Sequence, residues 1–232
     1  MIRSSAFVVG CLFGLTACKS QPSRPLSADN YEVAAADPAK VQQIKSDAVR
    51  ALLDQGQYYA ALAHIEAQKQ AIPDSPEVIY LEAEARRHLQ QREQADALYK
   101  RLLGGPLEGR AWHGLGLLTA SSDLGGAIRA LRNASNKLPT DVEIRNDLGY
   151  ALMEAGRYSE ALPELSTAAE LAPSQLKSRN NLIILMLLTG NQAGADRMAK
   201  QAGATPETVK QLRNQAQAIR SQQQARSGRT PA

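Results

Sequence analysis

A pattern of small residues, glycine, tyrosine and proline recurs along most of this chain at intervals of about 34 residues. Its clearest copy is the segment 142–175. The first half of that segment places apolar residues three or four positions apart, which predicts an amphipathic helix that Gly156 ends. A second stretch with the same rhythm follows Tyr158 and stops at Pro173, because proline cannot continue a helix. The segment therefore predicts two short helices joined by a tight turn.

The same pattern occurs in register along the chain. On the second helices an alanine recurs at intervals of 34, 32 and 34 residues, at Ala61, Ala95, Ala127 and Ala161. The predicted units are 42–75, 76–108, 109–141 and 142–175, and a partial fifth unit covers 176–204. A helix pair of this kind buries its apolar face only against a neighbouring pair, so we predict an all-α solenoid.

The order of these positions resembles the tetratricopeptide repeat (TPR), a helix–turn–helix unit of 34 residues. Gly149 and Ala161 stand where the two helices of such a unit cross, and small side chains there let the backbones approach. The second unit has Gln90 where the others have a turn glycine, and the third is one residue short at this turn. The resemblance implies a right-handed TPR solenoid with about four full repeats.

The C-terminal part of the chain predicts one more helix. Thr205 and Pro206 are typical of a helix start, and we expect a capping helix over 205–224 and a disordered tail over 225–232. The segment 182–188 is apolar on every side of a helix, so all of its faces need cover. The 205–224 helix could supply that cover, or a partner helix or strand could dock there, and the sequence leaves both open.

The N-terminus has the features of an export signal. Arg3 precedes a short apolar run that is too short to span a bilayer, and the run closes with Leu15-Thr16-Ala17-Cys18. This resembles the lipobox of bacterial lipoproteins, which implies a signal peptide over 1–17 and covalent diacylglycerol and N-acyl chains on Cys18. A plain secretory signal with a chance cysteine is the alternative.

The lipobox also bears on location. Residues 18–41 are predicted to form the lipidated cysteine and a flexible tether, because prolines and small residues predominate there. Lys19 follows the cysteine where a sorting aspartate would stand, and the absence of that aspartate implies a lipid anchor at the periplasmic face of the outer membrane of a Gram-negative bacterium. Cys18 is then the only mature cysteine, so no intramolecular disulfide is expected.

Nothing in the sequence predicts catalysis. The three histidines, His64, His88 and His113, fall in three different repeats without metal-ligand spacing. Ser174 and Lys177 match the S-x-x-K of penicillin-binding enzymes, but the companion motifs are absent and Ser174 is better explained as a helix cap. The net charge of +4 is too small to predict nucleic-acid binding. We predict a protein-binding scaffold without enzymatic activity, cofactor, metal or small-molecule substrate.

In the TPR family the first helices of the repeats line a groove that binds protein segments. The groove positions of the family, carried over to this chain, predict a binding surface formed by Tyr80, Arg87, His113, Leu117, Asn146, Tyr150, Met153, Asn180, Ile184 and Leu187. The Lys and Asn pattern with which some members clamp a terminal carboxylate is missing, so that chemistry is not predicted.

Two motifs one repeat apart narrow the resemblance, Arg145-Asn146-Asp147-Leu148-Gly149-Tyr150 and Arg179-Asn180-Asn181-Leu182. Together with the lipobox and the chain length, they resemble the TadD family of TPR lipoproteins from tight-adherence (Flp) pilus loci. That resemblance implies a pilotin-like role, in which the groove holds a secretin subunit and the lipid brings it to the outer membrane. The alternative is an envelope adaptor that recruits peptidoglycan-modifying enzymes or another outer-membrane assembly complex.

Overall fold

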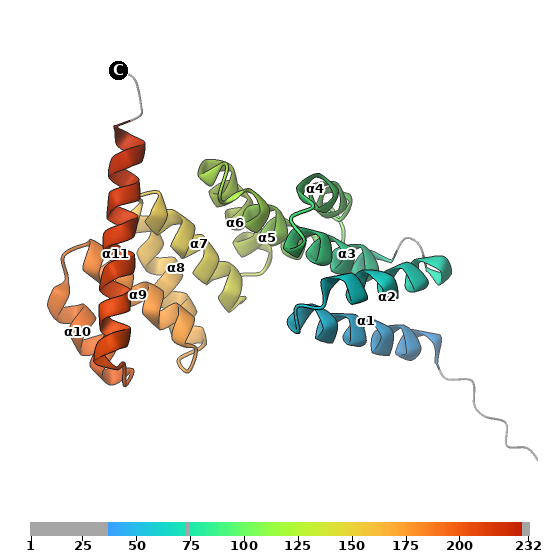
Figure 1. Ribbon diagram of the computed structural model, residues 1–232, viewed down its shortest axis with the longest axis horizontal. Helices are drawn as coiled ribbons and strands as arrows, with labels where there is room; N and C mark the ends of the chain where they lie inside the picture. The colour runs from blue at the N-terminus through green and yellow to red at the C-terminus, as the bar shows by residue number, and fades with distance from the viewer. Residues whose placement is uncertain (1–36, 73–74, 229–232) are drawn as a thin grey trace, which may run out of the picture. The chain divides into compact units, whose positions relative to one another are not determined.

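The computed structural model describes residues 37–72 and 75–228. The chain divides into two units, Met1–Asp37 and Pro38–Ala232. The described part of the second unit contains eleven α-helices and no strand (Figure 1). The predicted signal peptide 1–17, Cys18 and the tether up to residue 36 lie outside the described residues.

Ten of the helices form five consecutive pairs, and the eleventh follows them (Figure 1). The pairs are α1 (Pro38–Asp54) with α2 (Tyr58–Ala71), α3 (Pro76–His88) with α4 (Arg92–Arg101), α5 (Glu108–Thr119) with α6 (Leu124–Lys137), α7 (Val142–Glu154) with α8 (Tyr158–Leu171), and α9 (Leu176–Leu188) with α10 (Gln192–Gln201). The last helix is α11 (Pro206–Ser227). Each of the first four pairs also packs against the pair that follows it. The predicted all-α solenoid of helix pairs is therefore confirmed.

Glycines allow the helices of a pair to approach each other closely. A Cβ atom built on Gly149 of α7 would lie 2.6 Å from Leu165 Cγ of α8, which is closer than such atoms pack. Gly116 of α5 stands in the same relation to Leu131 of α6, also at 2.6 Å. Both leucines are buried in the core. Gly149 thus lies at the crossing of two helices, as its place in the repeat predicts.

The turns inside the pairs require an unusual backbone conformation. Gly56, Gly156 and Gly190 have φ between +72° and +81°, a region that glycine adopts without steric cost. Gln90 occupies the equivalent position of the second repeat with φ +60°, although it carries a side chain. In the shorter turn of the third repeat, the side chain of Asp123 instead accepts a hydrogen bond from Gly126 N at the start of α6.

The two ends of the described unit differ from the predicted boundaries. The first helix begins at Pro38, four residues before position 42, so the predicted tether 18–41 is too long at its C-terminal end. Proline suits the first turn of a helix, since the amide hydrogen that it lacks would have no partner there. The last helix ends at Ser227, three residues beyond 224, and so extends into the predicted tail 225–232. Arg226 donates to Glu154 O at 3.4 Å, which gives that extension a contact.

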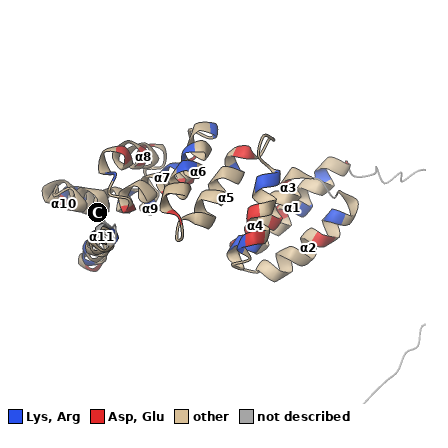
Figure 2. Cartoon of the chain, turned by 90° about the horizontal axis from the view of Figure 1, so that it is seen from above, with Lys and Arg blue, Asp and Glu red and all other residues tan. Residues whose placement is uncertain are grey.

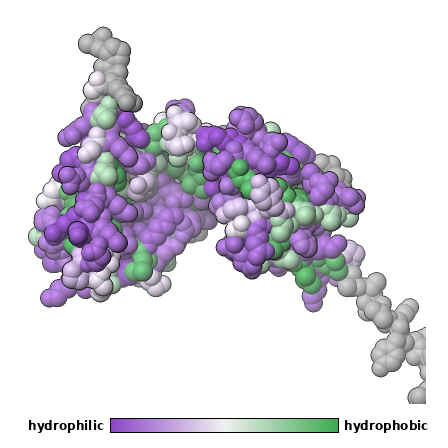
Figure 3. All heavy atoms as spheres, viewed as in Figure 1, coloured by the Kyte–Doolittle hydropathy of each residue, from purple (hydrophilic) through white to green (hydrophobic). Residues whose placement is uncertain are grey.

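The surface of the described unit is mostly polar. Hydrophilic residues cover most of the face that Figure 3 shows, with small hydrophobic patches between them. Acidic and basic residues are interspersed along the helices rather than segregated (Figure 2). Among the described helices, none combines the length and the apolar character needed to cross a membrane.

Candidate protein-binding groove

The ten predicted groove residues lie on the first helices of the second to fifth pairs. Seven of them are partly exposed, namely Tyr80, Arg87, His113, Leu117, Tyr150, Asn180 and Leu187. The other three, Asn146, Met153 and Ile184, are buried. The structure therefore does not offer the ten residues as one continuous surface, and its N-terminal, middle and C-terminal parts differ.

An open cavity of about 250 Å³ lies between α1, α3 and α5. We call it the N-terminal groove; its lining residues are Arg50, Leu53, Asp54, Tyr80, Leu81, Glu84, His88 and Arg110. The guanidinium carbon of Arg110 lies 5.7 Å from the centre of the Tyr80 ring, within the range of a cation–π contact. Arg110 itself is exposed. The cavity thus combines apolar walls with an accessible cation over an aromatic ring.

A buried polar cluster supports the wall of this groove. Arg87 donates to Glu84 at 2.7 Å and to the Tyr99 hydroxyl at 3.3 Å, and that hydroxyl donates to Glu84. Burial, with the nearby Glu84 carboxylate, raises the pKa of the Tyr99 hydroxyl, so it remains a donor. Arg87 is therefore engaged inside the protein, and it orients Glu84 rather than presenting a free charge to a partner.

Polar side chains tie the middle helices to one another. His113 Nε2 of α5 lies 2.8 Å from Asp147 Oδ2 of α7, and Lys177 Nζ of α9 donates to Asp147 Oδ1 at 3.0 Å. Burial alone would raise the pKa of Asp147, but the hydrogen bond with His113 and the charge of Lys177 lower it. Asn181 Nδ2 of α9 donates to Asn146 Oδ1 of α7 at 2.9 Å. The prediction that Asn146 lines the groove is wrong, because its side chain is used to join α7 and α9.

The C-terminal part of the predicted groove is covered by α11. Leu212, Ala216 and Ile219 of α11 are buried in the same hydrophobic cluster as Met153 and Ile184. Of the two covers that the sequence leaves open for the apolar fifth repeat, the structure has the chain's own last helix, which packs on α9 (Figure 1). Met153 and Ile184 therefore belong to the core, and their prediction as groove residues is corrected.

Polar side chains of α11 also occupy the C-terminal ends of two helices. Gln223 Nε2 donates to Met153 O at 2.8 Å, and the Tyr158 hydroxyl donates to Gln223 Oε1 at 2.6 Å. Arg220 Nη2 donates to the carbonyl oxygens of Leu187 at 3.3 Å and Leu188 at 3.4 Å. Carbonyl groups in the last turn of a helix have no partner within the helix and carry partial negative charge. The polar side of α11 thus caps α7 and α9.

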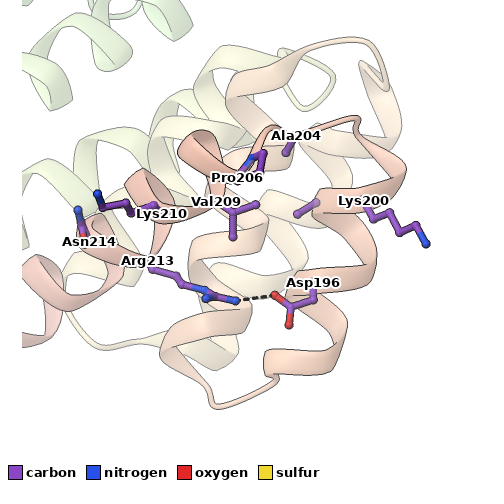
Figure 4. A pocket seen from close by; sticks show the side chains of 9 residues that line it. Asp196, Lys200, Ala204, Pro206, Val209, Lys210, Arg213 and Asn214 are labelled. Carbon is purple, nitrogen blue, oxygen red and sulfur yellow. Dashed lines mark hydrogen bonds and ion pairs between the residues drawn. The ribbon is translucent and has the colours of Figure 1, made fainter.

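The N-terminal half of α11 is positioned against α10. Figure 4 shows Arg213 of α11 directed at Asp196 of α10, and their closest atoms are 3.0 Å apart. Val209 lies beside them and lines an open cavity of about 470 Å³ between the two helices. Thr205 caps the start of α11 by accepting a hydrogen bond from Thr208 N.

The S-x-x-K motif does not have the geometry of a catalytic site. Lys177 Nζ pairs with Glu143 at 2.7 Å and with Asp147 at 3.0 Å. Burial would lower the pKa of Lys177, but its hydrogen bond to Glu143 and the charge of Asp147 raise it, so it stays protonated and cannot take a proton from Ser174. The cap of α9 is Gln175 rather than Ser174, which corrects the prediction for that serine.

Comparisons with known proteins establish the family. The tetratricopeptide-repeat profile matches residues 118–182. The TPR repeat-containing protein PA4299 of Pseudomonas aeruginosa is 31% identical over 192 residues, which are 82% of this chain and 75% of that protein. This chain belongs to the tetratricopeptide-repeat family.

Solved structures agree with that assignment at the level of the fold. The TPR protein superposes on P. aeruginosa PilF with a TM-score of 0.64 at 15% identity, covering 81% of this chain and 89% of PilF. It superposes on TTC0263, a thermophilic TPR protein of Thermus thermophilus, with a TM-score of 0.60 at 21% identity, covering 76% and 97% of the two chains. At these identities the likeness concerns the fold alone. TPR folds are typically non-catalytic scaffolds for protein interaction, and that is the function class of this TPR protein.

Proposed function

We propose that this protein is a lipid-anchored scaffold that uses the N-terminal groove to hold a secretin subunit during assembly of a tight-adherence pilus. The observation that carries the choice of surface is the exposed Arg110 over Tyr80 in an open cavity, while α11 covers the groove positions of α9. The choice of partner is supported by the resemblance of the Arg145–Tyr150 and Arg179–Leu182 motifs to the TadD family.

The N-terminal groove has the chemistry to bind a short protein segment. No carboxylate in the described part of the chain pairs with Arg110, so its charge is available to an acidic residue of a partner. Tyr80 presents an aromatic ring, and Leu53 and Leu81 present apolar walls. Aromatic and arginine anchors of this kind dominate the binding energy of many interfaces. The surface fits a segment that carries one apolar and one acidic side chain.

The lipid anchor supplies the second half of the proposed function. Acyl chains on Cys18 would each contribute ~0.8 kcal/mol per buried CH₂, and more than one chain makes the attachment stable. A groove on an anchored protein keeps its bound partner near the periplasmic face of the outer membrane. Holding and delivering a partner needs no cofactor beyond the acyl chains, so we infer a non-enzymatic role in assembly.

A secretin assembly assay tests this proposal. Tyr80→Ala combined with Arg110→Ala should lower the yield of membrane-bound secretin multimers about as much as deletion of the gene, since both anchors are lost. Tyr59→Ala is the matched control, because Tyr59 is 74% exposed on α2, away from the groove, and should leave the yield unchanged. Unchanged multimers in the deletion strain would contradict the proposal, as would co-purification with peptidoglycan enzymes in place of a secretin.

A further inference from the structure

The last helix has the amphipathic pattern of a helix that docks in a groove. Its apolar side chains stand at Val209, Leu212, Ala216 and Ile219, at intervals of three, four and three residues. Leu212, Ala216 and Ile219 are at most 5% exposed. The remaining positions are mostly glutamine, arginine and other polar residues. Such spacing places one narrow apolar stripe on a helix, as in helices that bind to the hydrophobic groove of another protein.

The surface beneath α11 is wider than that stripe. Residues 182–188 of α9 are apolar all round, and α8 and α10 pack on α9 as well as α11. Besides the cavity beside Val209, two more flank α11, one of about 410 Å³ at Leu187 and one of about 590 Å³ at Gly156 and Tyr158. Protein cores do not normally leave such volumes beside a packed helix. A helix with larger apolar side chains would fill this surface better than α11 does.

The attachment of α11 is also of a kind that can open. It is the last helix of the described chain, and residues 202–205 alone join it to α10. Its ion pair with Asp196 is about half exposed on both sides, at 52% for Arg213 and 51% for Asp196, and so contributes little. Terminal elements with few buried contacts open locally before the rest of a protein does.

We propose that the face of α9 beneath α11, with the adjoining end of α7, is a second docking surface, and that α11 is its resident occupant. The ligand is an amphipathic helix of a partner protein with the 3–4–3 apolar spacing of α11 and bulkier apolar side chains. One turn after the stripe it carries arginine or glutamine, which donate to the carbonyl groups where Gln223 and Arg220 now donate. The partner helix binds when α11 leaves.

Competition with α11 makes this proposal measurable. If the face is filled in most molecules, the apparent affinity for a second helix is reduced by the fraction of molecules that are open. A change that releases α11 must therefore strengthen binding. The probe is a fluorescent peptide of residues 205–228 with Ala216→Leu, and its control is the same peptide with Leu212→Glu and Ile219→Glu.

The peptide is titrated against the full chain and a release variant, Arg220→Ala with Gln223→Ala, which removes the helix caps and leaves the core intact. Fluorescence anisotropy should show at least about tenfold tighter binding to the release variant than to the wild type. Gln211→Ala with Gln215→Ala alters only exposed positions of α11 and should bind like the wild type. The control peptide should bind to none of them.

Hydrogen exchange provides a second readout on the wild-type chain. Saturating peptide should remove protection from α11 and leave α1 to α6 unchanged, whether or not the release variant folds. Equal affinity of both peptides, no binding to a folded release variant, or undiminished protection of α11 would overturn the proposal. A release variant that dimerises in light scattering would instead make a second copy the occupant. The secretin assay changes Tyr80 and Arg110 only, so either proposal can fail alone.

Discussion

At the scale of single residues, Gly149 tests how closely the helices of a pair pack. Gly149→Ala places a methyl group 2.6 Å from Leu165 Cγ, so α7 and α8 must separate or the leucine must leave its rotamer. We expect a loss of about 1–3 kcal/mol in the free energy of unfolding, measured by urea denaturation. Gly125→Ala is the control, since its new atom meets nothing closer than 3.5 Å and should leave stability unchanged or slightly raised.

Gln90 tests the turn between paired helices. Its φ of +60° is a conformation that residues with a Cβ adopt at a cost. Gln90→Gly should therefore raise the free energy of unfolding by about 0.5–1 kcal/mol, less than the full cost because glycine also loses more entropy on folding. Gly156→Ala makes the reverse change at φ +72° and should destabilise the protein. A loss of stability in Gln90→Gly would show that its side chain, not its backbone, matters there.

At the scale of elements, Asp147 connects three first helices through His113 and Lys177. The folded pKa of Asp147 is lowered, so its ionised form stabilises the fold above the unfolded pKa of about 3.9, and this benefit is lost as the pH falls through the folded pKa. Asp147→Asn should lower the free energy of unfolding by about 1–3 kcal/mol at pH 7. The difference from wild type should shrink at pH 3. An equal difference at both pH values would exclude the charge of Asp147 as the cause.

The helix pairs could be predicted from the sequence because their signals are local. Gly156, Pro173 and the apolar spacing between them are sufficient to mark two helices and a turn. The cover over Ile184 could not be predicted, since an apolar helix does not indicate which segment packs on it. The contact that decides the matter joins Gln223 to Met153 O, 70 residues apart.

The groove positions show the same division between local and distant information. Tyr80 could be placed by its position in the repeat, and it lines the N-terminal groove. Arg110 was missed because it is not at one of the family's groove positions, although its partner ring lies on the preceding first helix. Arg220 and Gln223 were also missed, yet their place one turn beyond the apolar stripe of α11 is a signal that can be read from sequence.

At the scale of the whole molecule, the proposed function separates binding from delivery. Cys18→Ser should abolish the lipid anchor and leave the repeats and the N-terminal groove intact. We expect the variant to bind the secretin subunit with unchanged affinity in solution, and secretin multimers to disappear from the outer-membrane fraction. Multimers that remain there at wild-type levels would mean that Cys18 has no role in delivery. Loss of binding in solution would place Cys18 in the binding surface instead.

Photo-crosslinking from Tyr80 tests the central claim most directly. A benzophenone amino acid replaces Tyr80 in the N-terminal groove or, as the control, Tyr59 on the exposed side of α2. The two full-length variants are irradiated with a purified secretin subunit of the same bacterium, and the products are identified by mass spectrometry. The account predicts a crosslink to the secretin from position 80 and none from position 59. Crosslinks from position 59 with none from position 80 would contradict it.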